Sequence, residues 1–302
     1  MGSIGGMVQR IPRGLVTAFW FAVGIGCAVA LTPPIFDLSI LLGFEFDFLR
    51  TFRRILLLAA VIVLAFRLRP WRDGNLESYG LTFSKENAGA TLGAYVMTVA
   101  VIAALIQIEL SAGWMKWQLR PDYISRAARY ALSGFVIAFL EELFFRGWML
   151  RRMTRAKGGL VALVWTNFIY ALAHGFKPRH VTVDVADTWQ GALMALGIWA
   201  RHMFSPAFWP SILGLFLFGL LLSALFLRSN SLWPSVGVHA ASVLMLHGVV
   251  PSLTGTSPPD WAGTKMMYDG LPGWLLLSTV ALLIWRIQRP QRDESTCAVP
   301  TE

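Results

Sequence analysis

The chain has 302 residues, of which 56% are hydrophobic and only 14% are charged. Soluble domains average about 25% charged residues, so this composition excludes a soluble globular protein and indicates a membrane protein. The net charge of +9 does not indicate a nucleic-acid partner, because the basic residues lie beside the ends of apolar runs, as at residues 151–157. The two cysteines, Cys27 and Cys297, suggest neither a disulfide framework nor a thiolate metal site.

Eight apolar runs are long enough to cross a bilayer as helices of about 20 residues. In chain order they begin near Leu15, Arg54, Gly89, Tyr130, Gly159, Trp209, Ser231 and Gly273. They predict an all-α, polytopic protein with one integral membrane domain over residues 1–302 and a disordered polar tail at 287–302. Eight spans place both termini on one side, and the excess of Lys and Arg there predicts that this side is cytoplasmic.

The longest stretch outside the apolar runs is residues 175–208, between the fifth and sixth runs. The apolar positions of residues 189–203 predict an interfacial helix within it. A loop of this length is often a gate or a binding element, so a role in substrate access is one interpretation and an ordered surface hairpin is the other.

The fourth run carries three charged residues, Glu141, Glu142 and Arg146, inside an otherwise apolar segment. Each such charge costs about 2.5–3.5 kcal/mol at the centre of a membrane helix, so ionisable residues there predict a functional site. Glu142 and Arg146 are four residues apart and are expected to form an ion pair on one face of the helix. Glu141 lies about 100° around the helix and lacks such a local partner.

Two further runs carry polar residues at helical spacing. In the fifth run, Asn167, Tyr170 and His174 share one face, and in the seventh run His239 and Ser242 do. The site is therefore expected between the fourth, fifth and seventh spans.

Glu141, His174 and His239 together supply the groups of a water-activating site, with a carboxylate base and imidazoles for proton transfer or oxyanion stabilisation. The same three residues could instead bind zinc or another divalent metal, since two histidines and a carboxylate leave one position open for water. The spacing does not decide between these alternatives, although the compact HExxH zinc motif is absent from the sequence.

The order and spacing of these residues resemble the type II CAAX prenyl protease family of intramembrane endopeptidases, also called the CPBP or Abi family. The matching positions are Glu141, Glu142, Arg146, Tyr170, His174 and His239, the last in a helix opened by Ser231-Leu-Trp-Pro. The resemblance covers about residues 128–250, which we take as the catalytic core.

The resemblance implies a glutamic-type protease that cleaves peptide bonds within the bilayer. It implies that Glu141 activates water, that His174 cooperates with it, and that His239 helps to stabilise the oxyanion. Glu142 and Arg146 would orient the site.

The chain departs from the family at Val243, where an Asn or a similar polar residue usually follows the last histidine by four positions. A missing oxyanion donor typically costs about 10²–10³ in rate. Ser242 and Asn167 are the candidates to replace it.

The expected partners are membrane lipid and a peptide or protein substrate, with no nucleic acid and no cofactor, metal remaining the alternative. Prenylated CAAX tails, bacteriocin-type leaders and C-terminal sorting signals are all compatible with the family. Length and resemblance predict the bacterial cytoplasmic membrane.

Two other functions are weighed against the protease. A catalytically weak scaffold or immunity protein is favoured by Val243. A proton-coupled transporter would also use buried Glu and His residues, but it predicts interrupted helices and an inverted repeat, which the sequence does not display.

Overall fold

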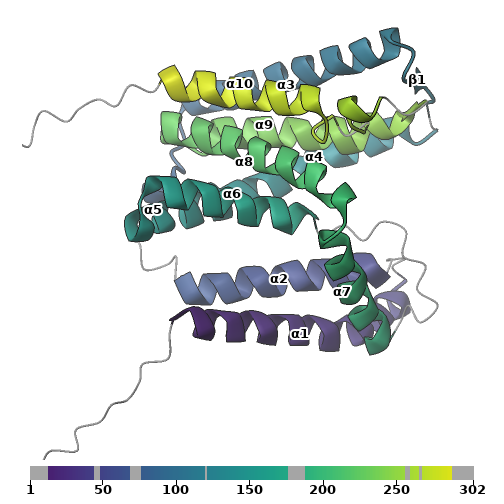
Figure 1. Cartoon of the computed structure of the whole chain (residues 1–302), viewed down its shortest axis with the longest axis vertical. Coiled ribbons are helices and arrows are strands. Elements are labelled where there is room, and N and C mark those ends of the chain that lie inside the picture. The colour runs from purple at the N-terminus through teal and green to yellow at the C-terminus, as the bar shows by residue number, and fades with distance from the viewer. Residues whose placement is uncertain are drawn as a thin grey trace, which may run out of the picture. The chain divides into compact units, whose positions relative to one another are not determined.

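The computed structural model of the protein describes residues 13–43, 48–68, 76–119, 121–175, 188–255, 259–264 and 267–287. This part of the chain is helical apart from turns, short loops and one two-stranded ladder, which confirms the all-α class (Figure 1). The chain divides into two compact units, residues 1–74 with 173–208 and residues 75–172 with 209–302. The predicted tail, from residue 288, and residues 176–187 of the long loop lie outside the described residues.

The first unit consists of α1 (Arg13–Leu41), α2 (Phe48–Leu68), α7 (Trp189–Met203) and the short helix η4 (Pro206–Phe208). The interfacial helix expected at residues 189–203 is thus present as α7. It begins after Thr188, whose hydroxyl accepts a hydrogen bond from the backbone N–H of Gly191, as an N-cap residue does. The buried core of this unit consists of Ala28, Phe36, Phe48, Phe52, Ala192 and Ala195.

The second unit holds the remaining elements. Its main helices are α3 (Lys85–Ser111), α4 (Tyr123–Glu142), α5 (Arg151–Lys157), α6 (Gly159–Gly175), α8 (Trp209–Ser229), α9 (Trp233–Val243) and α10 (Leu271–Ile287). Its shorter elements are η2 (Leu76–Tyr79), η3 (Leu143–Leu150), η5 (Leu244–Val249), η6 (Val250–Ser252) and η7 (Asp260–Ala262), and the antiparallel strands β1 (Lys116–Trp117) and β2 (Leu253–Thr254). The boundary between the two units falls after residue 172, within the last turn of α6. This helix is continuous from Gly159 to Gly175.

Helix α9 is the centre of the second unit, because α3, α4 and α8 all pack against it (Figure 1). Small residues permit these close contacts. A Cβ atom on Gly237 of α9 would collide with the backbone carbonyl oxygen of Thr91 in α3. A Cβ atom on Gly134 of α4 would lie 2.9 Å from Cγ1 of Val243. Small residues at helix crossings are typical of membrane proteins, where helices associate by close packing.

A helix lies at each of the eight predicted positions. Four helical segments in the described part of the chain are long and apolar enough to cross a membrane: Ala22–Leu41, Lys85–Ser111, Pro206–Ser229 and Trp233–Ser252. The apolar helices Gly159–Gly175 and Leu271–Arg286 are shorter. The protein is therefore an integral membrane protein of helices, while the number of eight spans stays a prediction.

Candidate active site

The two glutamates lie at the end of α4, where the helix changes its winding. Residues Leu143–Leu150 continue the helix as a π-helix, η3, which the sequence did not predict. A second π-helix, η5, follows α9 directly after Val243. Segments of π-helix are rare and occur frequently at functional sites. Both lie beside helix ends that carry the predicted site residues.

Glu142 and Arg146 form the ion pair that their spacing predicted. Nη1 of Arg146 donates to Oε1 of Glu142 over 3.0 Å, and neither side chain has any exposed surface. Burying two charges is costly unless further hydrogen bonds satisfy them. The neighbours of Arg146 are therefore part of the site.

The second amino group of Arg146 reaches two other helices. Its Nη2 donates to Oδ1 of Asn167 in α6 over 3.2 Å and to the backbone carbonyl of Gly219 in α8 over 3.1 Å. Ser223, one turn further along α8, also donates to Oδ1 of Asn167. The guanidinium carbon lies 4.5 Å from the centre of the Tyr170 ring, within the range of a cation–π contact. The Arg146 side chain thus links α4, α6 and α8.

Asn167 makes three hydrogen bonds in this network. Its Oδ1 accepts two hydrogen bonds, and its Nδ2 donates to the carbonyl of Leu163 over 2.8 Å. A Cβ atom on Gly219 would lie 2.7 Å from Oδ1 of Asn167, so glycine is needed at that position for the contact. The arrangement favours a supporting role for Asn167 over donation to an oxyanion.

His239 lies between the two glutamates. Its Nδ1 is 2.9 Å from Oε1 of Glu142, and its Nε2 is 3.7 Å from Oε2 of Glu141. An ionised carboxylate can only accept, so the proton of this hydrogen bond belongs to Nδ1 of His239. The edges of Tyr170 and Phe218 pack around the imidazole, with ring centres 6.1 and 5.8 Å away. The ring orientation is therefore fixed from several sides.

The two glutamates differ sharply in exposure. The side chain of Glu142 is fully buried, and that of His239 is 4% exposed, whereas that of Glu141 is 29% exposed. Part of the Glu141 side chain is thus exposed, although its Oε2 atom, which faces His239, is buried. The burial of Glu142 agrees with its predicted ion pair, while the separate roles expected for the two glutamates stay predictions.

His174 lies in the last turn of α6, one turn after Tyr170 on the same face of that helix. Glu141, His174 and His239 each offer one nitrogen or oxygen atom, and these three atoms lie within 4.8 Å of one another. Such a group can hold a water molecule between a base and two imidazoles. It is also a ligand set that zinc accepts, and the hydrogen bond from Nδ1 of His239 to Glu142 is the kind of contact that orients a metal-binding histidine.

Ser242 and Val243, three and four positions after His239, make different contacts. The Ser242 hydroxyl donates to the backbone carbonyl of Val238 over 2.9 Å, within its own helix. Val243 faces Gly134 of α4, so the position where the family resemblance expects Asn belongs to the contact between α4 and α9. Ser242 can therefore donate to an oxyanion only if its side chain rotates away from the Val238 carbonyl.

Sequence reasoning missed the contribution of α8. The backbone carbonyl of Gly219, the Ser223 hydroxyl and the Phe218 ring all belong to the site, although the predicted site involved only the fourth, fifth and seventh spans. Gly219 and Ser223 are two small residues four positions apart in an apolar run. This pattern is typical of close helix contacts in membranes and could have indicated the site.

Comparison with known proteins gives a family match. Residues 124–245 match the family model described as Rce1-like, the type II CAAX prenyl endopeptidases. No curated protein and no solved structure matches the chain. The matched segment contains Glu141, His174 and His239 together with their supporting residues on α4, α6, α8 and α9. Over residues 124–245 the chain is thus similar to the Rce1-like type II CAAX prenyl endopeptidases, which confirms the family resemblance seen in its motifs.

Proposed function

We propose that the protein is an intramembrane endopeptidase that hydrolyses peptide bonds of membrane-associated substrates with a water molecule activated by Glu141. The observation that carries the proposal is the chain of contacts that ends at Glu141. Arg146 forms an ion pair with Glu142, and Glu142 accepts a hydrogen bond from Nδ1 of His239. The other ring nitrogen of His239, Nε2, lies beside the partly exposed carboxylate of Glu141. Such order around one accessible carboxylate is what a general base requires.

In the proposed reaction, the Glu141 carboxylate takes a proton from water as the water oxygen attacks the carbonyl carbon of the scissile peptide. The resulting tetrahedral intermediate collapses when the carbon–nitrogen bond breaks, and the proton held by Glu141 passes to the leaving amine. His174 would bind the water molecule by a hydrogen bond and assist the transfer of its proton. His239 would stabilise the oxyanion in its doubly protonated form, with Nδ1 donating to Glu142 and Nε2–H turned toward the substrate.

The metal-dependent form of the reaction uses the same residues. Glu141, His174 and His239 would then hold zinc or another divalent cation, which when bound lowers the pKa of its water ligand and polarises the peptide carbonyl. The hydrogen bond from Nδ1 of His239 to Glu142 would orient the imidazole in either case. The two forms differ in their response to a chelator.

A catalytically weak scaffold of the same family is the second candidate. Its support is Val243, which packs against Gly134 and carries no polar group toward the site. A scaffold would keep the buried network of Arg146 for stability, and it would tolerate replacement of the partly exposed Glu141 without loss of function.

The family description suggests a prenylated C-terminal peptide as the first substrate to test, with bacteriocin-type leaders and sorting signals after it. We further propose a bacterial cytoplasmic membrane with both termini on the cytoplasmic side. This orientation places the basic helix α5, with Arg151, Arg152, Arg155 and Lys157, on the same side, as the positive-inside rule requires.

The test uses the full chain in lipid vesicles with a fluorescence-quenched farnesylated peptide and a quenched peptide library, with and without EDTA. Wild type, Glu141→Gln and Glu109→Gln are compared, the last as a matched control because Glu109 is a carboxylate in α3 outside the site. Cleavage that survives EDTA and is lost only in Glu141→Gln supports the glutamate mechanism. Cleavage lost to EDTA supports the metal form, and an unaffected Glu141→Gln would overturn both.

A further inference from the structure

Tyr268 lies just before α10, in a segment that contributes none of the site residues described above. It stands outside residues 124–245, the part of the chain that matches the family model. Helix α8 sets its position. A Cβ atom on Gly214 of α8 would collide with the backbone carbonyl oxygen of Tyr268 and would lie 3.0 Å from its ring. Glycine at position 214 therefore allows both the backbone and the ring of Tyr268 to lie against α8.

This contact is on the side of α8 that faces His239. Gly214 and Phe218 are four residues apart, so they are neighbours along one face of the helix. The Phe218 ring packs on the imidazole of His239, with ring centres 5.8 Å apart. Tyr268 therefore lies about one helical turn along α8 from the ring that covers His239.

A second helix, α6, places the Tyr268 side chain near the catalytic residues. The ring centre of Tyr170 in α6 is 6.1 Å from that of His239. Glu141 and Tyr268 are both among the ionisable groups that are close enough to act electrostatically on the Tyr170 hydroxyl. The contacts from α8 and from α6 thus agree, and they place the Tyr268 phenol beside the region that Tyr170, His239 and Glu141 surround.

The backbone on both sides of Tyr268 is held by local contacts. The buried carboxylate of Asp269 accepts hydrogen bonds from the backbone N–H of Thr264, over 2.8 Å, and from the Thr264 hydroxyl. The backbone of Gly270 approaches the Ala262 carbonyl so closely that a Cβ atom at position 270 would collide with it. A side chain on a fixed backbone loses less conformational entropy when it binds a substrate, as preorganised catalytic groups do.

The proposed reaction needs hydrogen-bond donors for the oxyanion. His239 supplies one donor, while the Ser242 hydroxyl donates to the carbonyl of Val238. A phenol is protonated at neutral pH and can donate, and tyrosine is one of the side chains that form oxyanion holes. The half-buried position of Tyr268 suits this role, because a hydrogen bond is stronger where water is partly excluded.

We propose that Tyr268 is a further catalytic residue, whose hydroxyl donates a hydrogen bond to the oxyanion of the tetrahedral intermediate beside the Nε2–H of His239. The assignment rests on the proposed function, since only peptide hydrolysis creates this oxyanion. The hydrogen bond strengthens as negative charge develops on the oxygen, so it stabilises the transition state more than the bound substrate. Its loss therefore lowers kcat and leaves KM nearly unchanged.

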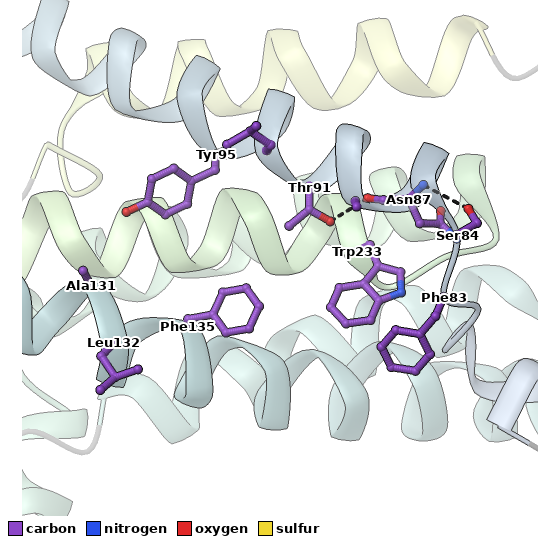
Figure 2. Close-up of a pocket in the computed structure, with 11 residues that line it drawn as sticks. Phe83, Ser84, Asn87, Thr91, Tyr95, Ala131, Leu132, Phe135 and Trp233 are labelled. Carbon is purple, nitrogen blue, oxygen red and sulfur yellow. Dashed lines mark hydrogen bonds between the residues drawn. The ribbon is translucent and has the colours of Figure 1, made fainter.

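The first test compares Tyr268→Phe with wild type, as full chains in lipid vesicles, on the quenched peptide that wild type cleaves fastest. This variant keeps the ring against Gly214 and removes only the hydroxyl. We expect kcat to fall by about 10²–10³, with KM and the melting temperature close to those of wild type. Tyr95→Phe is the matched control and should leave kcat unchanged. Tyr95 belongs to α3 and lines a groove whose lining includes none of the three catalytic residues (Figure 2).

A second readout tests binding of the oxyanion directly. A peptide phosphinate, in which tetrahedral phosphorus with a charged oxygen replaces the scissile carbonyl, imitates the intermediate. Its inhibition constant should rise in Tyr268→Phe by about the same factor as kcat/KM falls, because both quantities report contacts to the same oxygen. Binding of the uncleaved peptide, measured with Glu141→Gln present to prevent cleavage, should stay the same.

A third comparison tests whether Tyr268 acts from the position that Gly214 gives it. Gly214→Ala displaces the Tyr268 backbone, so it should lower turnover in wild type. In the Tyr268→Phe background the same change should have little further effect, since both substitutions remove the contact of one hydroxyl. Equal losses in the two backgrounds would overturn the assignment.

The outcomes separate this assignment from the proposed function. Cleavage by Tyr268→Phe within about threefold of the wild-type rate would overturn the role of Tyr268 and leave the protease intact. A higher KM with unchanged kcat would also overturn it, because Tyr268 would then bind the substrate and not the oxyanion. A fall in melting temperature that accounts for the lost rate would make its role structural. Absence of cleavage by wild type on every peptide would overturn the proposed function, and the role of Tyr268 with it.

Discussion

Oε1 of Glu142 lies 2.9 Å from Nδ1 of His239 and at the same time accepts a hydrogen bond from Arg146. One buried carboxylate oxygen thus connects the ion pair between α4 and η3 to the imidazole of α9. Because the carboxylate cannot donate, it fixes the proton on Nδ1 and directs Nε2 toward Glu141. The proton on Nδ1 and the orientation of His239 therefore depend on a residue that need not touch the substrate.

The first prediction separates the two adjacent glutamates. Glu141→Gln should reduce turnover by about 10²–10⁴, the usual contribution of a general base, with little change in thermal stability because its side chain is partly exposed. Glu142→Gln should destabilise the protein by about 3–5 kcal/mol, because it leaves the buried Arg146 charge without its partner. Turnover of a labelled peptide and thermal unfolding in detergent measure the two effects. Equal stability losses in both variants would contradict the assigned roles.

The second prediction concerns the geometry of Arg146. Arg146→Lys keeps the positive charge, but a single ammonium group cannot reproduce the planar fork that reaches Glu142, Asn167 and Gly219. We expect a loss of about 1.5–3 kcal/mol for each charged hydrogen bond that is not replaced, together with lower turnover. Arg155→Lys, on the exposed surface of α5, is the matched control and should change stability by less than about 0.5 kcal/mol. Thermal unfolding of the two variants measures these stability differences, and an equal, small change in both would contradict the role given to Arg146.

The third prediction tests the missed contribution of α8. Gly219→Ala adds a Cβ atom that would lie 2.7 Å from Oδ1 of Asn167, so Asn167 must shift away from Arg146. Overpacking of this kind costs about 1–3 kcal/mol, and we expect turnover to fall with it. At Gly93 of α3 an added Cβ meets nothing within 4 Å, so Gly93→Ala should be neutral or slightly stabilising. Similar melting temperatures for the two variants would contradict the role given to Gly219.

The fourth prediction concerns the second oxyanion donor. If the Ser242 hydroxyl turns from the Val238 carbonyl to the substrate during the reaction, Ser242→Ala should lower turnover by up to about 10²–10³ without a comparable change in stability. Ser242→Thr retains the hydroxyl and should recover part of the activity. An unchanged rate in Ser242→Ala would exclude Ser242 as the donor and leave His239 as the principal candidate. Single-turnover rates measure the effect without a contribution from product release.

Features that depend on one segment at a time could be predicted from the amino-acid sequence. Apolar length and spacing indicated where the helices of the membrane domain lie. The four-residue separation of Glu142 and Arg146 predicted their ion pair, which the structure confirms. Such contacts follow from helix geometry alone, because residues four apart lie on one face whatever surrounds the helix.

Contacts between side chains of different helices could not be predicted in this way. The family resemblance implied an oxyanion role for His239, but its hydrogen bond to Glu142 depends on how α9 is rotated against α4. The support that Gly219 and Ser223 give to Arg146 and Asn167 requires α8 to pack closely on α6. These contacts depend on helix rotation and crossing, which the packing of the whole unit sets and which no local pattern encodes.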